Sequence, residues 1–141
     1  MIAGSLVYGP LDKLLNTRKW VIFGGNFVGL VALVCLALMI EWNVWFSAFL
    51  MAVIGLFGAS FPMIVAHGKA FLPAHLTGRG VTLLNLFGIG GAGLMQFFTG
   101  RIHASNADMA APDLYATLFL VFAGTLAVGL VIYLFAPDRT D

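Results

Sequence analysis

A glycine-rich stretch is the most specific chemical motif in the sequence. Residues 88 to 93 read GIGGAG, which fits the G-x-G-x-x-G pattern of a dinucleotide-binding turn, and Asp113 follows about 20 residues after Gly93. In such a turn the glycines let the backbone approach a pyrophosphate at the N-terminus of a helix. That chemistry requires a preceding strand and an exposed loop, so the surrounding elements decide whether the motif can work.

The composition indicates that most of the chain's surface faces lipid. Of the 141 residues, 61% are hydrophobic and 9% are charged, whereas soluble domains average about 45 to 50% apolar and about 25% charged residues. So few charges cannot cover a surface that faces water, and the bilayer is the predicted partner. The net charge of +1 provides no field for binding nucleic acid, and none is expected.

Four uncharged runs are long enough to cross a bilayer, which takes about 20 helical residues. They cover residues 20–40, 44–66, 80–100 and 114–136. Because hydrocarbon offers backbone groups no hydrogen-bond partner, each run should be helical. The sequence therefore predicts an all-α polytopic membrane protein with four transmembrane helices, the second kinked near Pro62.

The position of GIGGAG within the third run argues against a cofactor loop. A turn at mid-run would leave amide groups unpaired in lipid, which is costly. Asp113 lies beyond the end of that run, beside Pro112, where the two residues predict the start of a helix. We therefore predict no cofactor, no catalytic residues and no enzymatic activity.

The charged residues predict how the chain is oriented. With four spans, the loops 9–19 and 67–79 and the tail 137–141 lie on one side and carry six of the seven Lys and Arg residues. Only Arg101, in the outer loop 101–113, lies opposite. The positive-inside tendency makes the basic side cytoplasmic, with both chain ends there. The aromatic residues near span ends are expected to anchor in the headgroup region: Trp20, Trp42, Trp45, Tyr115 and Tyr133.

Polar side chains within the spans are candidates for a binding role. At about 100° per residue, one face of the third span carries Asn85, Gln96, Thr82 and Thr99. The first span contains Asn26. Because an amide in hydrocarbon must face protein or a wet cavity, these groups are interpreted either as interhelical contacts or as the lining of a substrate pathway.

Pairs of small residues four positions apart predict where helices pack closely. Such pairs let another backbone approach a helix. They occur in three spans, as Gly88 and Ala92, Gly25 and Gly29, and Gly55 and Ala59.

The histidines and the cysteine do not indicate a metal site. His67 and His75 fall in the loop 67–79 and His103 falls on the opposite side, and no carboxylate or cysteine accompanies them at ligand spacing. We expect no metal. None of the four runs contains a charged residue, so this portion is predicted to supply no proton carrier within the membrane. Cys35 stands alone and cannot form an intrachain disulfide.

Two stretches resemble the major facilitator superfamily of transporters. Residues 4–19, GSLVYGPLDKLLNTRK, resemble the cytoplasmic loop between the second and third helix of each half, although Gly9 comes one residue late and Lys13 replaces the common arginine. Residues 72–100 resemble the penultimate helix and the loop before it, including Pro73, Gly78, Arg79, Gly80 and Asn85.

The resemblance implies a fold, a function and a location. Residues 1–141 would be the C-terminal part of a transporter domain, the last four of twelve helices, with residues 1–8 as the end of a truncated helix. The protein would move an unidentified small solute by alternating access, together with the remaining helices, in a bacterial inner (plasma) membrane. A cytoplasmic gate would comprise Gly9, Asp12, Lys13, Arg18, Lys19 and Arg79. In it Asp12 would pair with a helix N-terminus and a basic residue, with Arg79 as the first partner to test. Alternatively, these charged residues are solvated and only set the topology. The alternative to a transporter is a freestanding four-helix subunit or scaffold that oligomerises through glycine-rich helix faces.

Overall fold

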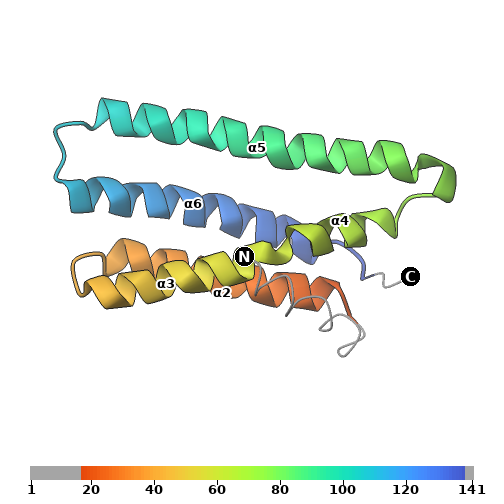
Figure 1. Ribbon diagram of the computed structural model, residues 1–141, viewed down its shortest axis with the longest axis horizontal. Coiled ribbons are helices and arrows are strands. Elements are labelled where there is room, and N and C mark those ends of the chain that lie inside the picture. The colour runs from red at the N-terminus through yellow and green to blue at the C-terminus, as the bar shows by residue number, and fades with distance from the viewer. Residues whose placement is uncertain (1–16, 139–141) are drawn as a thin grey trace.

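The computed structural model describes residues 17–138, and this part of the chain is helical without a strand (Figure 1). Gly9, Asp12 and Lys13 of the predicted gate, and the truncated helix predicted at residues 1–8, lie outside it. The elements in order are α2 (Lys19–Leu38), α3 (Val44–Phe57), η1 (Gly58–Ser60), α4 (Phe61–Lys69), η2 (Ala74–Leu76), α5 (Thr77–Ser105) and α6 (Ala111–Leu134).

Four helical segments are long and apolar enough to cross a membrane, as the sequence predicts: Lys19–Leu38, Val44–Lys69, Ala74–Ser105 and Ala111–Leu134. Their bounds differ from the predicted ones mainly in the second and third segments, which continue into the predicted loops. The length of an uncharged run reflects the thickness of the hydrocarbon core. A helix can continue beyond that run, because its ends are defined by its backbone hydrogen bonds. Arg79 and Arg101 therefore lie inside α5.

The second segment is interrupted near Pro62, where the sequence predicts a kink. The α-helix α3 ends at Phe57, a single 3₁₀ turn η1 follows, and α4 begins with Pro62 in its first turn. Proline has no N–H to donate to the preceding turn, so it is tolerated at a helix start. The predicted helix start at Pro112 is confirmed, with Pro112 and Asp113 in the first turn of α6.

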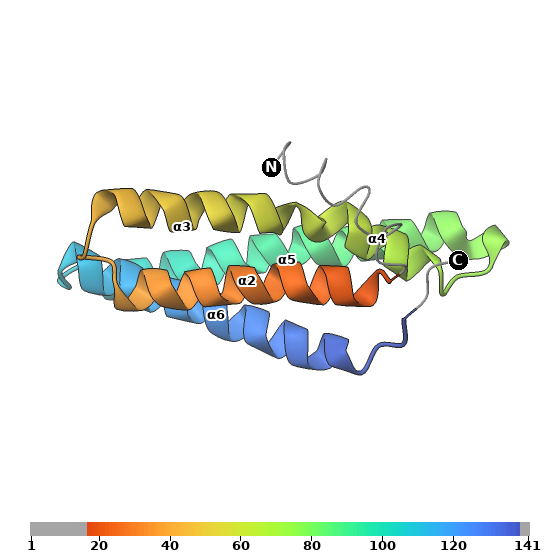
Figure 2. The ribbon, with the colours of Figure 1, turned by 90° about the horizontal axis from the view of Figure 1, so that it is seen from below.

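Helix α2 is the centre of the buried core and lies between α3 and α6 (Figure 2). Near its start, Val21 and Ile22 pack with Ala59 and Met63 of the interrupted segment. Near its end, two further residues of α2 pack with α3 in a second cluster of buried residues, Ala32, Leu36 and Leu50. Both clusters therefore depend on α2.

Helix α5 lies at the edge of the bundle. None of its 29 residues is buried within the described structure, and it packs mainly against α4, with only a small contact to α6 (Figure 1). Its length and apolar character match those of the other segments, but its sides remain largely uncovered.

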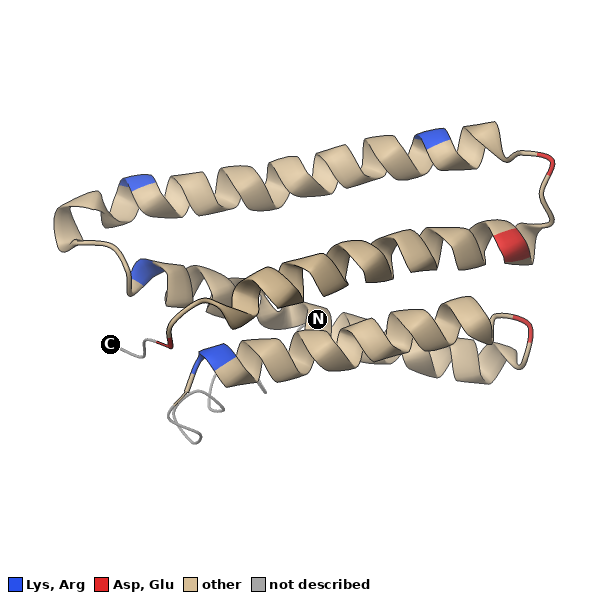
Figure 3. Ribbon diagram, turned by 180° about the vertical axis from the view of Figure 1, so that it is seen from behind, with Lys and Arg blue, Asp and Glu red and all other residues tan. Residues whose placement is uncertain are grey.

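Among the described residues, the two ends of the bundle carry net charges of opposite sign (Figure 3). The end that holds the start of α2 and the α4–α5 connection carries Arg18, Lys19, Lys69 and Arg79, together with Asp138. The other end carries Glu41, Asp108, Asp113 and Arg101. The charges are thus segregated as the sequence predicts, and the side of the membrane on which the basic end lies stays a prediction.

We predict that Leu36→Ala destabilises the fold by about 2 to 5 kcal/mol, because a buried leucine leaves a cavity that its neighbours fill only in part. Leu36 is 2% exposed. The matched control is Leu38→Ala on the same helix, where the side chain is 74% exposed. Unfolding by SDS in detergent micelles measures the free energy of unfolding, and equal losses in both variants would contradict the assignment of α2 as the core.

Candidate functional site

The GIGGAG stretch lies in the middle of α5 and is continuous helix. Its backbone N–H groups are engaged in the helical hydrogen-bond ladder, so they cannot cradle a phosphate in the way that a glycine turn does. No strand precedes it among residues 17–138. The dinucleotide interpretation therefore has no structural basis at this position.

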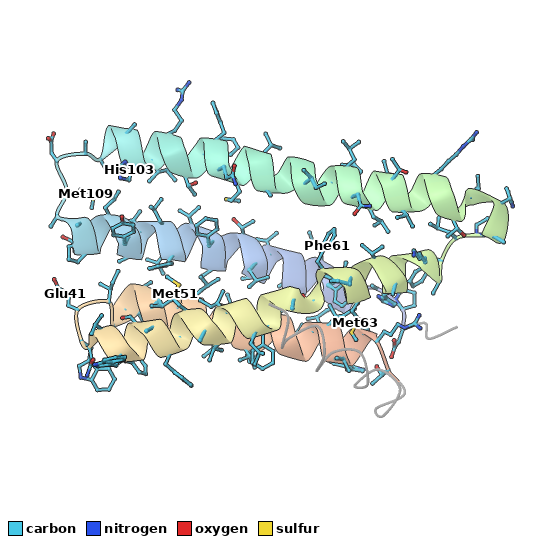
Figure 4. The ribbon with its side chains drawn as sticks, in the orientation of Figure 1. Glu41, Met51, Phe61, Met63, His103 and Met109 are labelled. Carbon is cyan, nitrogen blue, oxygen red and sulfur yellow. The ribbon has the colours of Figure 1, made fainter. Side chains whose placement is uncertain are left out.

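Only one glycine of this stretch has a close neighbour from another helix. A Cβ added to Gly88 would lie 2.7 Å from the ring of Phe61, which projects from α4 toward α5 (Figure 4). The neighbour of Gly88 is thus an aromatic side chain, whereas the sequence predicted a second backbone. Gly90, Gly91 and Gly93 have no atom within 4 Å of an added Cβ in the described structure.

The other predicted packing residues lie at different depths. Gly25 and Gly29 are buried in α2, and Ala59 is buried against that helix. Gly55 is half-buried in α3 and Ala92 is exposed on α5. An added Cβ at Gly29 or Gly55 meets nothing within 4 Å among the described atoms, so the described helices do not approach closely at these two glycines.

The polar residues of α5 are not joined to the rest of the bundle by described hydrogen bonds. The hydroxyls of Thr82 and Thr99 donate to backbone carbonyls of their own helix, at Gly78 and Met95. Asn85 is half-buried and Gln96 is exposed. Within residues 17–138, neither amide has a side-chain hydrogen bond, so both are available to groups that the described helices do not provide.

Asn26 connects α2 to the interrupted segment. Its Nδ2 donates to the Ser60 Oγ at 3.1 Å and to the Ile22 carbonyl at 2.8 Å. Ser60 is 3% exposed and lies in the 3₁₀ turn, where it gives the amide a partner from another element. Beside this pair, α2, α4 and α6 enclose an apolar hollow of about 200 Å³, below the volume of about 300 Å³ at which ligand pockets begin.

Asp138 caps the N-terminus of α2 at the basic end. Its carboxylate accepts hydrogen bonds from the Thr17 hydroxyl and, at 3.0 Å, from the Lys19 backbone N–H. Burial opposes ionisation, but these hydrogen bonds and one from the Arg18 backbone outweigh it and hold the pKa of Asp138 below its ordinary value. A carboxylate at this position also interacts favourably with the helix dipole.

Lys19 makes the reciprocal contact with the C-terminus of α6. Its Nζ donates to the Leu134 carbonyl at 2.7 Å, and an ammonium group stabilises the unpaired carbonyls at a helix end. The start of α2 thus contacts the Asp138 carboxylate, and the end of α6 contacts the Lys19 ammonium group. These contacts bring together residues more than 110 positions apart in the sequence.

His67 forms a second link at the same end. The sequence predicts a loop at this position, but α4 continues through Lys69 and His67 is only 3% exposed. Its Nδ1 lies 2.6 Å from the Tyr133 hydroxyl, and its ring packs edge-on against the rings of Tyr133 and Phe71. The buried imidazole thus has a polar partner from another helix. Tyr133 therefore does more than anchor at an interface.

One acidic residue at the basic end, Asp138, was not among the predicted gate residues, and the predicted pairing of Asp12 with Arg79 lies outside the described residues. Of the predicted gate, Arg18 and Lys19 lie at the start of α2, and Arg79 is exposed in the first turns of α5. The carboxylate beside Lys19 is Asp138. The sequence does contain a signal for this contact, since an even number of spans brings the start of the first span and the end of the fourth to the same side.

Neither a metal-binding cluster in the described residues nor a match to known proteins was found. No group of three or more His, Cys, Asp or Glu side chains within residues 17–138 could hold a metal ion. The chain matches no protein-family model, no curated protein and no solved structure.

We predict that Asp138→Asn lowers stability at pH 7 by about 0.3 to 1 kcal/mol, the range for an exposed charge at a helix end. Because folding lowers the pKa of Asp138, the ionised group stabilises the fold above its unfolded pKa. This contribution is lost as the pH falls through the lower folded pKa. The variant should therefore differ less from the wild type near pH 3 than at pH 7.

The measurement is the free energy of unfolding at the two pH values, in the same detergent. Asp108→Asn is the control, because Asp108 is an exposed residue of the loop before α6. A loss that is equal at both pH values, or equal in the control, would contradict the capping role of Asp138.

Proposed function

We propose that the chain is an integral membrane protein that crosses the bilayer four times, with its basic end in the cytoplasm. Four described helices have the required length and hydropathy. Large apolar side chains cover the outside of the bundle, which lipid tolerates and water does not. The charges gather at the two ends, where loops leave the hydrocarbon (Figure 3).

We further propose that this bundle belongs to a secondary transporter of a small solute. The observation that carries the proposal is the state of α5, a 29-residue helix without a buried residue. It presents the amides of Asn85 and Gln96 within an apolar stretch, and hydrocarbon is an expensive environment for both. Additional helices or a water-filled pathway must cover them, and a larger transporter supplies both.

The proposed mechanism is alternating access, in which two helical bundles rock around a central site. In this mechanism α5 lies between the described core and the rest of the transporter, with Asn85 and Gln96 facing the pathway or a neighbouring helix. The 3₁₀ turn η1 gives the second segment a natural bending point beside the contact of Phe61 with Gly88. Substrate contacts would come in part from the remaining helices.

The second candidate is a freestanding subunit or scaffold that oligomerises through α5. The open space beside Gly90, Gly91 and Gly93 favours it, because small residues let a second helix approach. The two candidates differ in what covers α5. An upstream coding sequence for eight more spans would support the transporter, whereas a stable oligomer of this chain alone would support the subunit.

The orientation predicts which loops a membrane-impermeant maleimide reaches in intact spheroplasts. In a Cys35→Ser background, Asp108→Cys should label from outside. His75→Cys should label only after permeabilisation, because it lies at the basic end. Both residues are exposed in the structure, so access depends on the membrane alone. Labelling of both sites from the same side would contradict the four-span topology.

In the full-length transporter, Gln96→Leu should reduce uptake more than Val128→Leu does. Gln96 lies on the polar face of α5. Val128 is 61% exposed on α6, and its replacement by leucine leaves the position apolar. Uptake of a panel of radiolabelled solutes measures transport, and surface expression of each variant provides the correction. Equal uptake by both variants would remove the role of Gln96 in the pathway or in packing.

A further inference from the structure

An open hollow lies at the end of the bundle opposite the basic end, called here the acidic end. Its wall comes from α2, α3, α6 and the connection between α2 and α3. Its volume is about 490 Å³, within the range of about 300 to 1,000 Å³ that ligand pockets occupy. Most of the wall is apolar and includes Leu36, Met51 and Phe119, and the polar residues include Glu41 and Ser47 (Figure 4). An apolar hollow with a few polar groups is typical of a site for a small molecule.

The Ser47 hydroxyl in this hollow is a buried polar group without a partner. Its Oγ is buried and makes no hydrogen bond to any described residue. The hydroxyls of Thr117 and Thr125 on α6, by contrast, each donate to a carbonyl of their own helix. Because an unpaired hydroxyl is costly to bury, a ligand group that forms a hydrogen bond with Ser47 gains from a cost that the free protein already bears.

A second hollow, which shares Glu41 with the first, adds another carboxylate. Its volume is about 440 Å³, and its wall includes Trp42 and, from the first turn of α6, Asp113. The side chains of Glu41 and Asp113 are both exposed. Neither carboxylate forms a hydrogen bond or an ion pair within residues 17–138. Both are therefore available to a ligand.

These groups favour a positively charged ligand. An ionised carboxylate accepts hydrogen bonds but cannot donate them, so two of them attract a cation and repel an anion. Trp42 is 66% exposed, and the face of an indole ring is the best aromatic partner for a cation. Arg101, the cation described at this end, lies over the ring of Phe97 on α5 and lines neither hollow.

We propose that the two hollows form a binding site for a small organic amine with an apolar body. The ammonium group binds Glu41 and Asp113 beside Trp42, and the apolar body fills the larger hollow. A hydrogen-bonding group on that body reaches Ser47, which lies about one helical turn into α3. A phospholipid amine is disfavoured, because its phosphate would lie beside two carboxylates. The described helices form the site by themselves, so its test is independent of the proposed transport.

The probe is tyramine, which has an ammonium group, an aromatic body and a hydroxyl at its far end. Isothermal titration calorimetry of the complete chain in uncharged detergent measures its Kd, with empty micelles as the blank. Tyrosol, in which a hydroxyl replaces the ammonium group, should bind at least about fivefold more weakly, because it forms no ion pair. Equal affinity for the two probes, or no saturable binding of tyramine, would overturn the proposal. Displacement of tyramine by a short-chain phosphatidylethanolamine would assign the site to a lipid and also overturn it.

Carboxylate variants locate the ammonium group. Glu41→Gln and Asp113→Asn should each weaken tyramine binding about two- to fivefold, as expected for the loss of an exposed ion pair, and should leave tyrosol binding unchanged. The matched control is Asp108→Asn, an exposed acidic residue of the same end that lines neither hollow. An equal loss in the control would indicate a general effect of charge and overturn the assignment.

A serine variant tests the deeper contact. Ser47→Ala should weaken tyramine binding about two- to tenfold through loss of one hydrogen bond. It should leave unchanged the binding of phenethylamine, which lacks the phenol hydroxyl. Because the change removes a buried group without a partner, unfolding of the free variant in SDS should show no loss of stability. An equal loss of affinity for both amines would overturn the role of Ser47.

Discussion

The packing of other segments against α2 is the interaction on which the rest of the structure depends. Small and branched side chains of this helix pack against the 3₁₀ turn and α4 near its start, and against α3 near its end. In a bilayer this contact must come from close packing, because lipid tails are as apolar as leucine and burying leucine among helices provides little hydrophobic gain. Van der Waals contact and a few interhelical hydrogen bonds then hold the helices together.

Polar contacts fix how the ends of these helices meet. Asn26 joins α2 to Ser60 within the apolar core, where an unpaired amide would be costly. At the basic end, Asp138 and Lys19 satisfy the termini of α2 and α6, and Tyr133 satisfies one nitrogen of His67. The contacts at the basic end join α2, α4 and α6 and give this end a defined arrangement.

Helix α5 shows the opposite behaviour. It follows the same rules of length and hydropathy as the other segments, yet nothing in residues 17–138 buries it. The ring of Phe61 occupies the space left by Gly88, and the remaining glycines are open to further contacts. The bundle therefore combines a packed part built around α2 with a helix that the described residues leave largely uncovered, and both proposed functions start from this asymmetry.

Hydropathy predicted the four membrane-length segments and their approximate bounds, and the positions of Lys and Arg predicted that the basic residues gather at one end. The reason is that a bilayer imposes a fixed thickness and forbids unpaired backbone groups. The break at Pro62 and the start of α6 at Pro112 were also predictable, since proline acts through local geometry. Span length says nothing of which side chains meet, so the sequence predicted a loop at His67 and did not single out Asp138. Only the tertiary structure placed His67 against Tyr133 and Asp138 at the start of α2, because these contacts join residues that are 66 and 119 positions apart.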